Sequence, residues 1–262
     1  MTTKPPLVLL HGVTNSARIW DDVVPLLDET FELLVPTAAG HRGGPPDPGG
    51  LTIARLVDDV ETLLDDHGLP QAHLAGNSMG GWMALELARR GRALSVCALS
   101  PAGCWSPGAD DEAHATSAIR RGRRLAAVAL PVAPIALRSR RIRRIALRDA
   151  AERADRLSPA QALGVVRDLV GCSAATDLLG TTEQVAPLTT SCPVTLAWAE
   201  RDRIFPPAVN GVTAQRLVPG ATYLELPAVG HVPMIDDPQL CARVIQEVCG
   251  VSQSRSGAGG ER

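Results

Sequence analysis

The stretch of sequence that decides the fold is AHLAGNSMGGWMALELARR, residues 72–90. Its first four residues form a short apolar run typical of a strand, and residues 79–90 have the pattern of a helix. Ser78 stands on the turn between them, in the motif Gly-Asn-Ser-Met-Gly. A nucleophile on so tight a turn has a strained backbone and needs small flanking residues, and its hydroxyl lies where helix N–H groups face developing negative charge. Ser78 is therefore the candidate nucleophile.

The alternation of strand and helix extends to both sides of this turn. Apolar runs bounded by Gly, Pro or polar residues predict further strands at residues 7–10, 31–35, 95–99, 194–198 and 221–226. Helical patterns with candidate caps such as Thr52 lie at residues 19–28, 52–67, 207–217 and 238–248. Such alternation indicates an α/β protein whose parallel sheet is covered on both faces.

The alternation stops between Pro101 and Cys192, where the sequence predicts helices only. We expect a helical cap at residues 108–180, inserted into a core made of residues 1–107 and 181–250. Residues 251–262 are low in apolar content and are expected to be a disordered tail. The cap region is basic: residues 114–156 carry 12 arginines against three acidic residues, a balance of +9 in a chain of formal net charge −2.

Two further polar residues follow predicted strands. His231 lies in the loop PAVGHVPM after the strand at 221–226, and Asp202 follows the strand at 194–198, with Glu200 as a rival two residues earlier. Open α/β sheets place their sites at the carboxyl ends of the strands, so Ser78, Asp202 and His231 should converge on one edge. A histidine base oriented by an acid is what a serine nucleophile needs.

These motifs resemble those of the α/β-hydrolase family over nearly the whole chain. The matching segments are HG at 11–12, GHRGG at 40–44, GNSMGG at 76–81, RDRIFPP at 201–207 and GHVPMIDDP at 230–238. The resemblance implies that Ser78 is the nucleophile, that His231 is general base and then acid, and that Asp202 is its partner. It also implies an oxyanion hole formed by the backbone N–H groups of Met79 and Val13.

The chain departs from the family pattern at its start. Most members carry an extra strand pair before the HG strand, but only about six residues precede it here. We therefore expect an α/β-hydrolase fold with a mostly parallel sheet of about six strands and a helical cap. The shorter sheet exposes an edge strand that a partner subunit could cover, so a homo-oligomer is possible.

The substrate pocket is expected between the cap and the sheet. Trp82 and Asn77 beside the turn, Trp105 at the start of the cap and His11 after the first strand are the candidate lining residues. Each has an ordinary structural role as its alternative. No zinc-ligand spacing is present, so we expect neither a metal nor another cofactor.

Hydrolysis of a small-molecule carboxylic ester through an acyl-enzyme is the default activity that the resemblance implies. One alternative is a carbon–carbon bond hydrolase of a vinylogous diketone acid, because such enzymes have a motif similar to GNSMGG around the nucleophile. They usually place Trp where this chain has Val232. Another is a non-hydrolytic member, such as a cyclase, lyase, perhydrolase or ligand-binding protein. Dehalogenases and epoxide hydrolases are disfavoured because they use an Asp nucleophile.

Composition excludes other classes. The chain has 45% hydrophobic and 21% charged residues, which excludes collagen-like and wholly disordered proteins. No apolar run reaches the length of a transmembrane segment, and the N-terminus does not resemble an export signal, so we expect a cytoplasmic protein. The charge balance and the few aromatic residues argue against nucleic-acid binding. The cap arginines are expected on solvated helix faces; an anionic-substrate gate, an acidic partner and an interfacial membrane contact are the alternatives.

Overall fold

The computed structural model describes residues 4–105, 110–189 and 192–251. Within them it shows one sheet of six parallel strands in the order β2-β1-β3-β4-β5-β6. The strands are β1 (Pro6–Leu10), β2 (Glu32–Leu34), β3 (Ala72–Asn77), β4 (Ala93–Leu99), β5 (Val194–Ala199) and β6 (Thr222–Leu226). The predicted α/β architecture, with a parallel sheet of about six strands, is confirmed.

Helices flank the sheet and form the cap. They are α1 (Ile53–Asp66), α2 (Met79–Arg89), α3 (Asp110–Ala129), α4 (Ala133–Ala136), α5 (Arg140–Ala146), α6 (Pro159–Gly171), α7 (Ala175–Leu178), α8 (Val212–Leu217), α9 (Pro233–Asp236) and α10 (Pro238–Val248). Short 3-10 or π turns lie at η1 (Ala17–Trp20), η2 (Val24–Leu26), η3 (Ala154–Arg156) and η4 (Pro207–Gly211).

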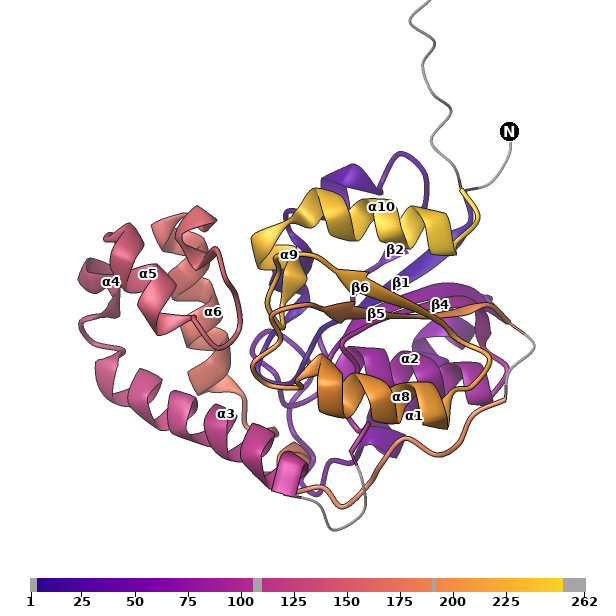
Figure 1. Cartoon of the computed structure of the whole chain (residues 1–262), viewed down its shortest axis with the longest axis horizontal. Helices are drawn as coiled ribbons and strands as arrows, with labels where there is room; N and C mark the ends of the chain where they lie inside the picture. Colours follow the sequence, from indigo (N-terminus) through magenta and orange to yellow (C-terminus); the bar gives the residue numbers. More distant parts are fainter. Residues whose placement is uncertain (1–3, 106–109, 190–191, 252–262) are drawn as a thin grey trace, which may run out of the picture.

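The sheet is the middle layer of the core. Figure 1 shows α1, α2 and α8 on one side of it and α10 on the other. Helix α1 shows why: its residues at helical spacing, such as Leu56, Val60 and Leu64, are buried against the sheet. The predicted cap at Thr52 is confirmed, since its side chain accepts from the N–H of Arg55 at 3.1 Å. Each face of the sheet thus has its own hydrophobic cluster.

The prediction of a helix at residues 19–28 is wrong. This region forms only the turns η1 and η2, closed mainly by hydrogen bonds between residues three apart, such as Val23 N–H to the Trp20 carbonyl at 2.8 Å. Pro25 stands in the middle of the segment and has no N–H to donate, so a continuous α-helix would lose a bond there. The apolar face, with Trp20, Val23 and Leu27, is nevertheless buried.

The helices between β4 and β5 form a separate lobe, which Figure 1 shows beside the sheet on the side of α9. It comprises α3 to α7, as expected of a helical insertion. Gly108, the expected first residue of the cap, lies outside the described residues, as do residues 252–262 of the expected tail. The exact domain boundaries stay a prediction. In the described part of the chain, no helix combines the length and apolar character needed to cross a bilayer.

Candidate active site

Ser78 occupies a sharp turn between β3 and α2. Its backbone has φ 57° and ψ −117°, a conformation that costs a non-glycine residue about 1–3 kcal/mol. Three backbone hydrogen bonds hold it there: Ser78 N–H donates to the Leu99 carbonyl at 2.9 Å, and the Ser78 carbonyl accepts from Trp82 at 3.1 Å and Ala102 at 3.0 Å. The surrounding structure therefore fixes the position of the hydroxyl.

The two glycines of the motif allow this turn to pack. A Cβ atom at Gly76 would lie 2.1 Å from the carbonyl oxygen of Gly80, and one at Gly80 would lie 2.2 Å from the carbonyl oxygen of Leu10. Both contacts are with backbone atoms that have no room to move aside. The spacing Gly-x-Ser-x-Gly is thus a packing requirement of the strand, the turn and the neighbouring strand β1.

His231 and Asp202 form a buried pair at the same end of the sheet. His231 Nδ1 lies 2.7 Å from Asp202 Oδ2, and the Asp202 side chain is completely buried. The other oxygen of Asp202, Oδ1, accepts hydrogen bonds from the N–H groups of Ile204 at 2.9 Å and Phe205 at 2.7 Å. The carboxylate is therefore held rigidly, with one oxygen free to orient the imidazole.

Glu200, the rival acid, has a different role. Its Oε2 accepts from the N–H of Ala228 at 2.6 Å, and the residue is exposed. The bond joins the end of β5 to the loop that carries His231, but the structure shows no contact between Glu200 and the ring of His231. Asp202 is the acid that meets the histidine.

Ser78 and His231 line one cavity between the core and the cap, with a volume of about 120 Å³. The structure shows no hydrogen bond between their side chains. In an unliganded site such a bond is often loose and tightens only with substrate. Helix α3 contributes Ala118, Ile119 and Gly122 to the wall, and α6 contributes Val165 and Leu169. The pocket is thus largely apolar around two reactive side chains.

The candidate oxyanion donors lie on either side of Ser78. Met79 is the first residue of α2, so its N–H has no acceptor within the helix. Val13 lies on the cavity wall, and its N–H donates to no group in the described residues. Both donors are available to a developing negative charge.

The charge of the cavity wall is unexpected for so basic a cap. Asp149 is the charged cap residue on the wall, and none of the cap arginines in the described residues lines it, although Arg148 Nε lies 3.7 Å from the largely exposed Asp149 carboxylate. The arginines are instead on outer faces or in structural bonds.

None of the four residues expected to line the pocket is on the wall of this cavity, although His11 lines the larger cavity described below. The Asn77 side chain donates to the carbonyls of Leu99 at 3.1 Å and His231 at 2.8 Å, so it ties the nucleophile turn to the histidine loop. Trp82 and Trp105 pack edge to face, 5.7 Å apart, and Trp105 in turn packs on Phe205. The rings of Phe205 and His231 also pack edge to face, with their centroids 5.1 Å apart. These aromatic rings therefore pack against one another and against the ring of His231.

His11 positions the loop that carries Val13. Burial and the nearby His41 lower the pKa of His11 to about 3, so the ring is neutral. Its Nε2 accepts from the N–H of Ala38 at 3.0 Å, which leaves the proton on Nδ1 for the Gly12 carbonyl at 2.8 Å. His11 therefore fixes the backbone next to the second candidate oxyanion donor.

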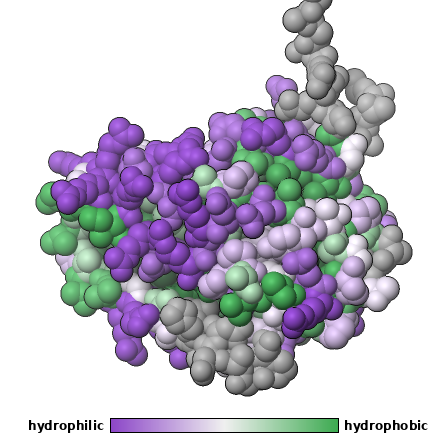
Figure 2. Space-filling view, in the orientation of Figure 1, coloured by the Kyte–Doolittle hydropathy of each residue, from purple (hydrophilic) through white to green (hydrophobic). Residues whose placement is uncertain are grey.

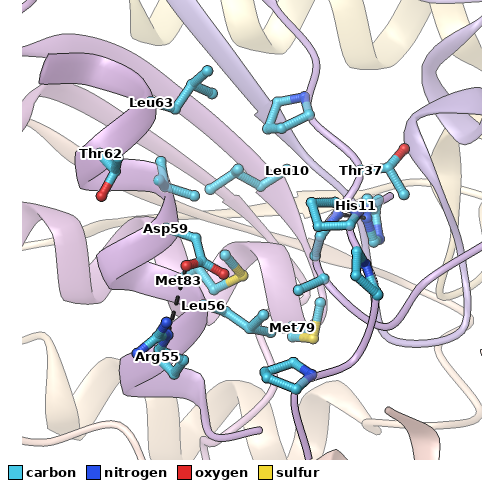
Figure 3. A pocket seen from close by; sticks show the side chains of 17 residues that line it. Leu10, His11, Thr37, Arg55, Leu56, Asp59, Thr62, Leu63, Met79 and Met83 are labelled. Carbon is cyan, nitrogen blue, oxygen red and sulfur yellow. Dashed lines mark hydrogen bonds and ion pairs between the residues drawn. The ribbon is translucent and has the colours of Figure 1, made fainter. Parts of the chain in front are cut away.

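A larger cavity, of about 460 Å³, lies behind this loop and contains neither Ser78 nor His231. Figure 3 shows His11 and Met79 on one side of it and the α1 side chains Leu56 and Asp59 on the other. Of the candidate site residues, Met79 and His11 line this cavity. We take the smaller cavity as the candidate site because Ser78 and His231 both line it.

Asp236 is a supporting residue that the sequence did not reveal. Its fully buried carboxylate accepts from the N–H groups of Gly230 at 2.7 Å, Glu152 at 3.0 Å and Arg153 at 2.6 Å. It thereby joins the histidine loop to the cap. The available signal was the charged pair in the MIDDP segment, but nothing in the sequence indicated that one of these two acids is buried.

Comparison with known proteins gives a consistent result. The model of the alpha/beta hydrolase family matches residues 7–244. The chain is 33% identical over 208 residues to "Epoxide hydrolase EphH" of Mycobacterium tuberculosis, covering 76% of this chain and 97% of the relative. It is 31% identical over 267 residues to "Pimeloyl-[acyl-carrier protein] methyl ester esterase" of Aromatoleum aromaticum, covering 94% and 98%.

A solved structure has the same fold. The thermophilic esterase from Thermogutta terrifontis superposes with a TM-score of 0.72 at 22% identity, over 94% of this chain and 90% of that one.

Proposed function

The chain belongs to the α/β hydrolase family and is an enzyme of the hydrolase kind, and we propose that it cleaves a small, uncharged carboxylic ester with Ser78, His231 and Asp202. The observation that carries the proposal is the arrangement of the three residues. A strained serine and a histidine share one cavity, and the histidine is bonded at 2.7 Å to a buried carboxylate.

The reaction proceeds in two acyl transfers. Ser78 Oγ attacks the ester carbonyl carbon while His231 Nε2 takes its proton, and the resulting oxyanion accepts from the N–H groups of Met79 and Val13. The alcohol leaves with the proton from His231, and water then hydrolyses the acyl-serine with His231 again as base. Asp202 stabilises the imidazolium formed in each step. One oxyanion donor is worth about 100–1000-fold in rate.

The cavity supports a small, neutral substrate. Its volume of about 120 Å³ corresponds to about four water molecules at about 30 Å³ each. Its apolar wall suits a short acyl or alkyl chain. A vinylogous diketone acid would need a cation for its carboxylate, and the cap arginines of the described residues stand away from the wall.

The test is a chain-length series of nitrophenyl esters, run in oxygen-18 water, with mass spectrometry of the protein during turnover. We expect acetyl and butyryl esters to react faster than the octanoyl ester, label in the acid product, and a transient acyl mass on the peptide that contains Ser78. An acid product without oxygen-18, or an acyl group on another residue, would contradict the proposal.

Epoxide hydrolysis is a second candidate, since a relative of 33% identity is named an epoxide hydrolase. The residues here give it less support. Opening an epoxide with the Ser78 hydroxyl would leave an ether, which water does not cleave as it cleaves an ester. The chain has a single tyrosine, Tyr223, which stacks on Trp198 rather than facing the cavity. Turnover of styrene oxide faster than of any ester would favour this candidate.

Charge selection gives a further prediction. Asp149 should repel anionic acyl groups, so a neutral butyryl ester should have a higher kcat/KM than a succinyl monoester of similar length. Asp149→Asn should narrow the ratio of the two kcat/KM values by about twofold at most, because Asp149 is largely exposed and lies 3.7 Å from Arg148, so that solvent and this cation screen its charge. The measurement is kcat/KM for both esters at low ionic strength. Glu200→Gln, outside the cavity wall, is the matched control and should leave the ratio unchanged.

A further inference from the structure

The outer part of the cap exposes an unusual number of aliphatic side chains. Of the ten large hydrophobic residues exposed in the described chain, six fall within residues 125–145. They are Leu125, Val128, Val132, Ile135, Ile142 and Ile145, with exposed fractions from 41% to 84%. We call these six residues the cap-tip patch.

The cap-tip patch lies on three consecutive helices. It spans the end of α3, α4 and α5, which are joined by links of three residues each. In each helical region the exposed residues are spaced by three, so each pair lies on one side of its helix. Figure 1 shows α4 and α5 at the end of the cap farthest from the sheet, and Figure 2 shows hydrophobic surface at that rim beside strongly hydrophilic surface.

Exposed arginines that make no structural bond lie in the same segment as the patch. Five exposed ones, in the part of the chain that the structure describes, make neither an ion pair nor a side-chain hydrogen bond: Arg121, Arg124, Arg138, Arg141 and Arg144. Other arginines in the same region do make structural bonds. Arg143, for example, is buried and donates to the carbonyls of Leu137 and Asp155. The five therefore add positive charge to the surface without holding the cap together.

We propose that the cap-tip patch docks on an anionic lipid surface. Aliphatic side chains that alternate along the chain with exposed arginines match such a surface in both of its parts, since the side chains enter the headgroup boundary while the guanidinium groups meet phosphates. A second copy of the chain would bring two clusters of positive charge together. An acidic protein would satisfy the arginines but would leave the aliphatic residues without a role.

Docking would bring the catalytic cavity close to the membrane. Helix α3 carries Leu125 and Val128 of the patch and also Ile119 and Gly122 of the cavity wall. One helix therefore links the patch to the wall of the cavity between the core and the cap. An enzyme docked in this way would draw its substrate from the lipid phase, where uncharged esters concentrate.

The experiment is vesicle co-sedimentation of the full chain. Phosphatidylcholine vesicles with one third phosphatidylglycerol should bind the protein, and vesicles of phosphatidylcholine alone should bind it at least tenfold less. Val128→Ser/Ile135→Ser should weaken binding about tenfold or more, because two side chains no longer leave water. Arg141→Glu/Arg144→Glu should weaken it about 25-fold or more, at about fivefold for each arginine lost.

Matched controls come from the core. Val209→Ser/Val212→Ser removes two exposed aliphatic side chains, and Arg216→Glu/Arg243→Glu makes the same charge change. The core variants should lower binding by less than threefold, and all four variants should hydrolyse a short soluble ester at the wild-type rate. Ser78→Ala should bind as wild type does, so failure of the proposed chemistry would not affect the binding result.

Four results would overturn the proposal. These are no binding to anionic vesicles, equal binding to neutral ones, equal loss in the core controls, and binding to soluble polyglutamate that the aliphatic variants leave unchanged. The last result would indicate an acidic protein as the partner instead. A concentration-dependent dimer, abolished by the cap variants in sedimentation velocity without lipid, would indicate a second copy.

Discussion

Ser78→Ala is expected to lower kcat for a short-chain ester on the order of a million-fold, leaving only the catalysis that binding and the oxyanion donors provide. The physical reason is that Ser78 is the hydroxyl residue on the cavity wall that stands at the N-terminus of a helix. Thr14 also lines the cavity and also has a positive φ, of 65°, but it does not start a helix. The measurement is active-site-normalised turnover of a butyryl ester, with preparations free of host esterase.

The same substitution should leave the fold intact. The three backbone hydrogen bonds of residue 78 do not involve its side chain, so the free energy of unfolding should change by less than about 1 kcal/mol. Ser78→Gly provides a matched control because glycine adopts φ 57° without strain. It should be equally inactive and at least as stable as Ser78→Ala in urea unfolding. Residual activity within tenfold of wild type in either variant would indicate another nucleophile.

The strands, and the position of Ser78, Asp202 and His231 at the carboxyl ends of three of them, could be predicted because both depend on local sequence patterns. Parallel strands bury both faces, so they appear as short apolar runs, and their carboxyl ends share one edge of the sheet. The segment at 19–28 was different because its burial pattern suits a helix while Pro25 prevents one. A pattern of apolar residues indicates which face is buried, but it does not indicate how the backbone hydrogen bonds are closed.

The supporting residues could not be predicted because their partners are distant in sequence. Asn77 contacts the carbonyl of His231, 154 residues away, and Asp236 accepts from cap residues more than 80 positions earlier. Such bonds depend on how the cap sits on the core. The placement of Asp149 on the cavity wall, rather than one of the twelve arginines of residues 114–156, depends on the same packing.

Asp202→Asn is expected to lower kcat about 10⁴-fold at neutral pH. Asn can keep its oxygen toward the N–H groups of Ile204 and Phe205, and its amide nitrogen then replaces Oδ2 beside His231 Nδ1. Because that NH₂ group donates, Nδ1 must become the acceptor and the ring proton moves to Nε2. A protonated Nε2 cannot accept the proton of Ser78. The measurement is kcat against pH, together with a check by urea unfolding that the variant is folded.

Glu200→Gln separates this effect from a general loss of carboxylates. Gln can still accept from the N–H of Ala228 with its amide oxygen, so kcat should fall by less than about threefold. A loss as large as that of Asp202→Asn would assign the orienting role to Glu200. The double variant should behave as Asp202→Asn alone, because an exposed side chain bonded to Ala228 does not reach the buried imidazole. If the double variant lost more activity than the two single losses combined, both acids would contribute to orienting His231.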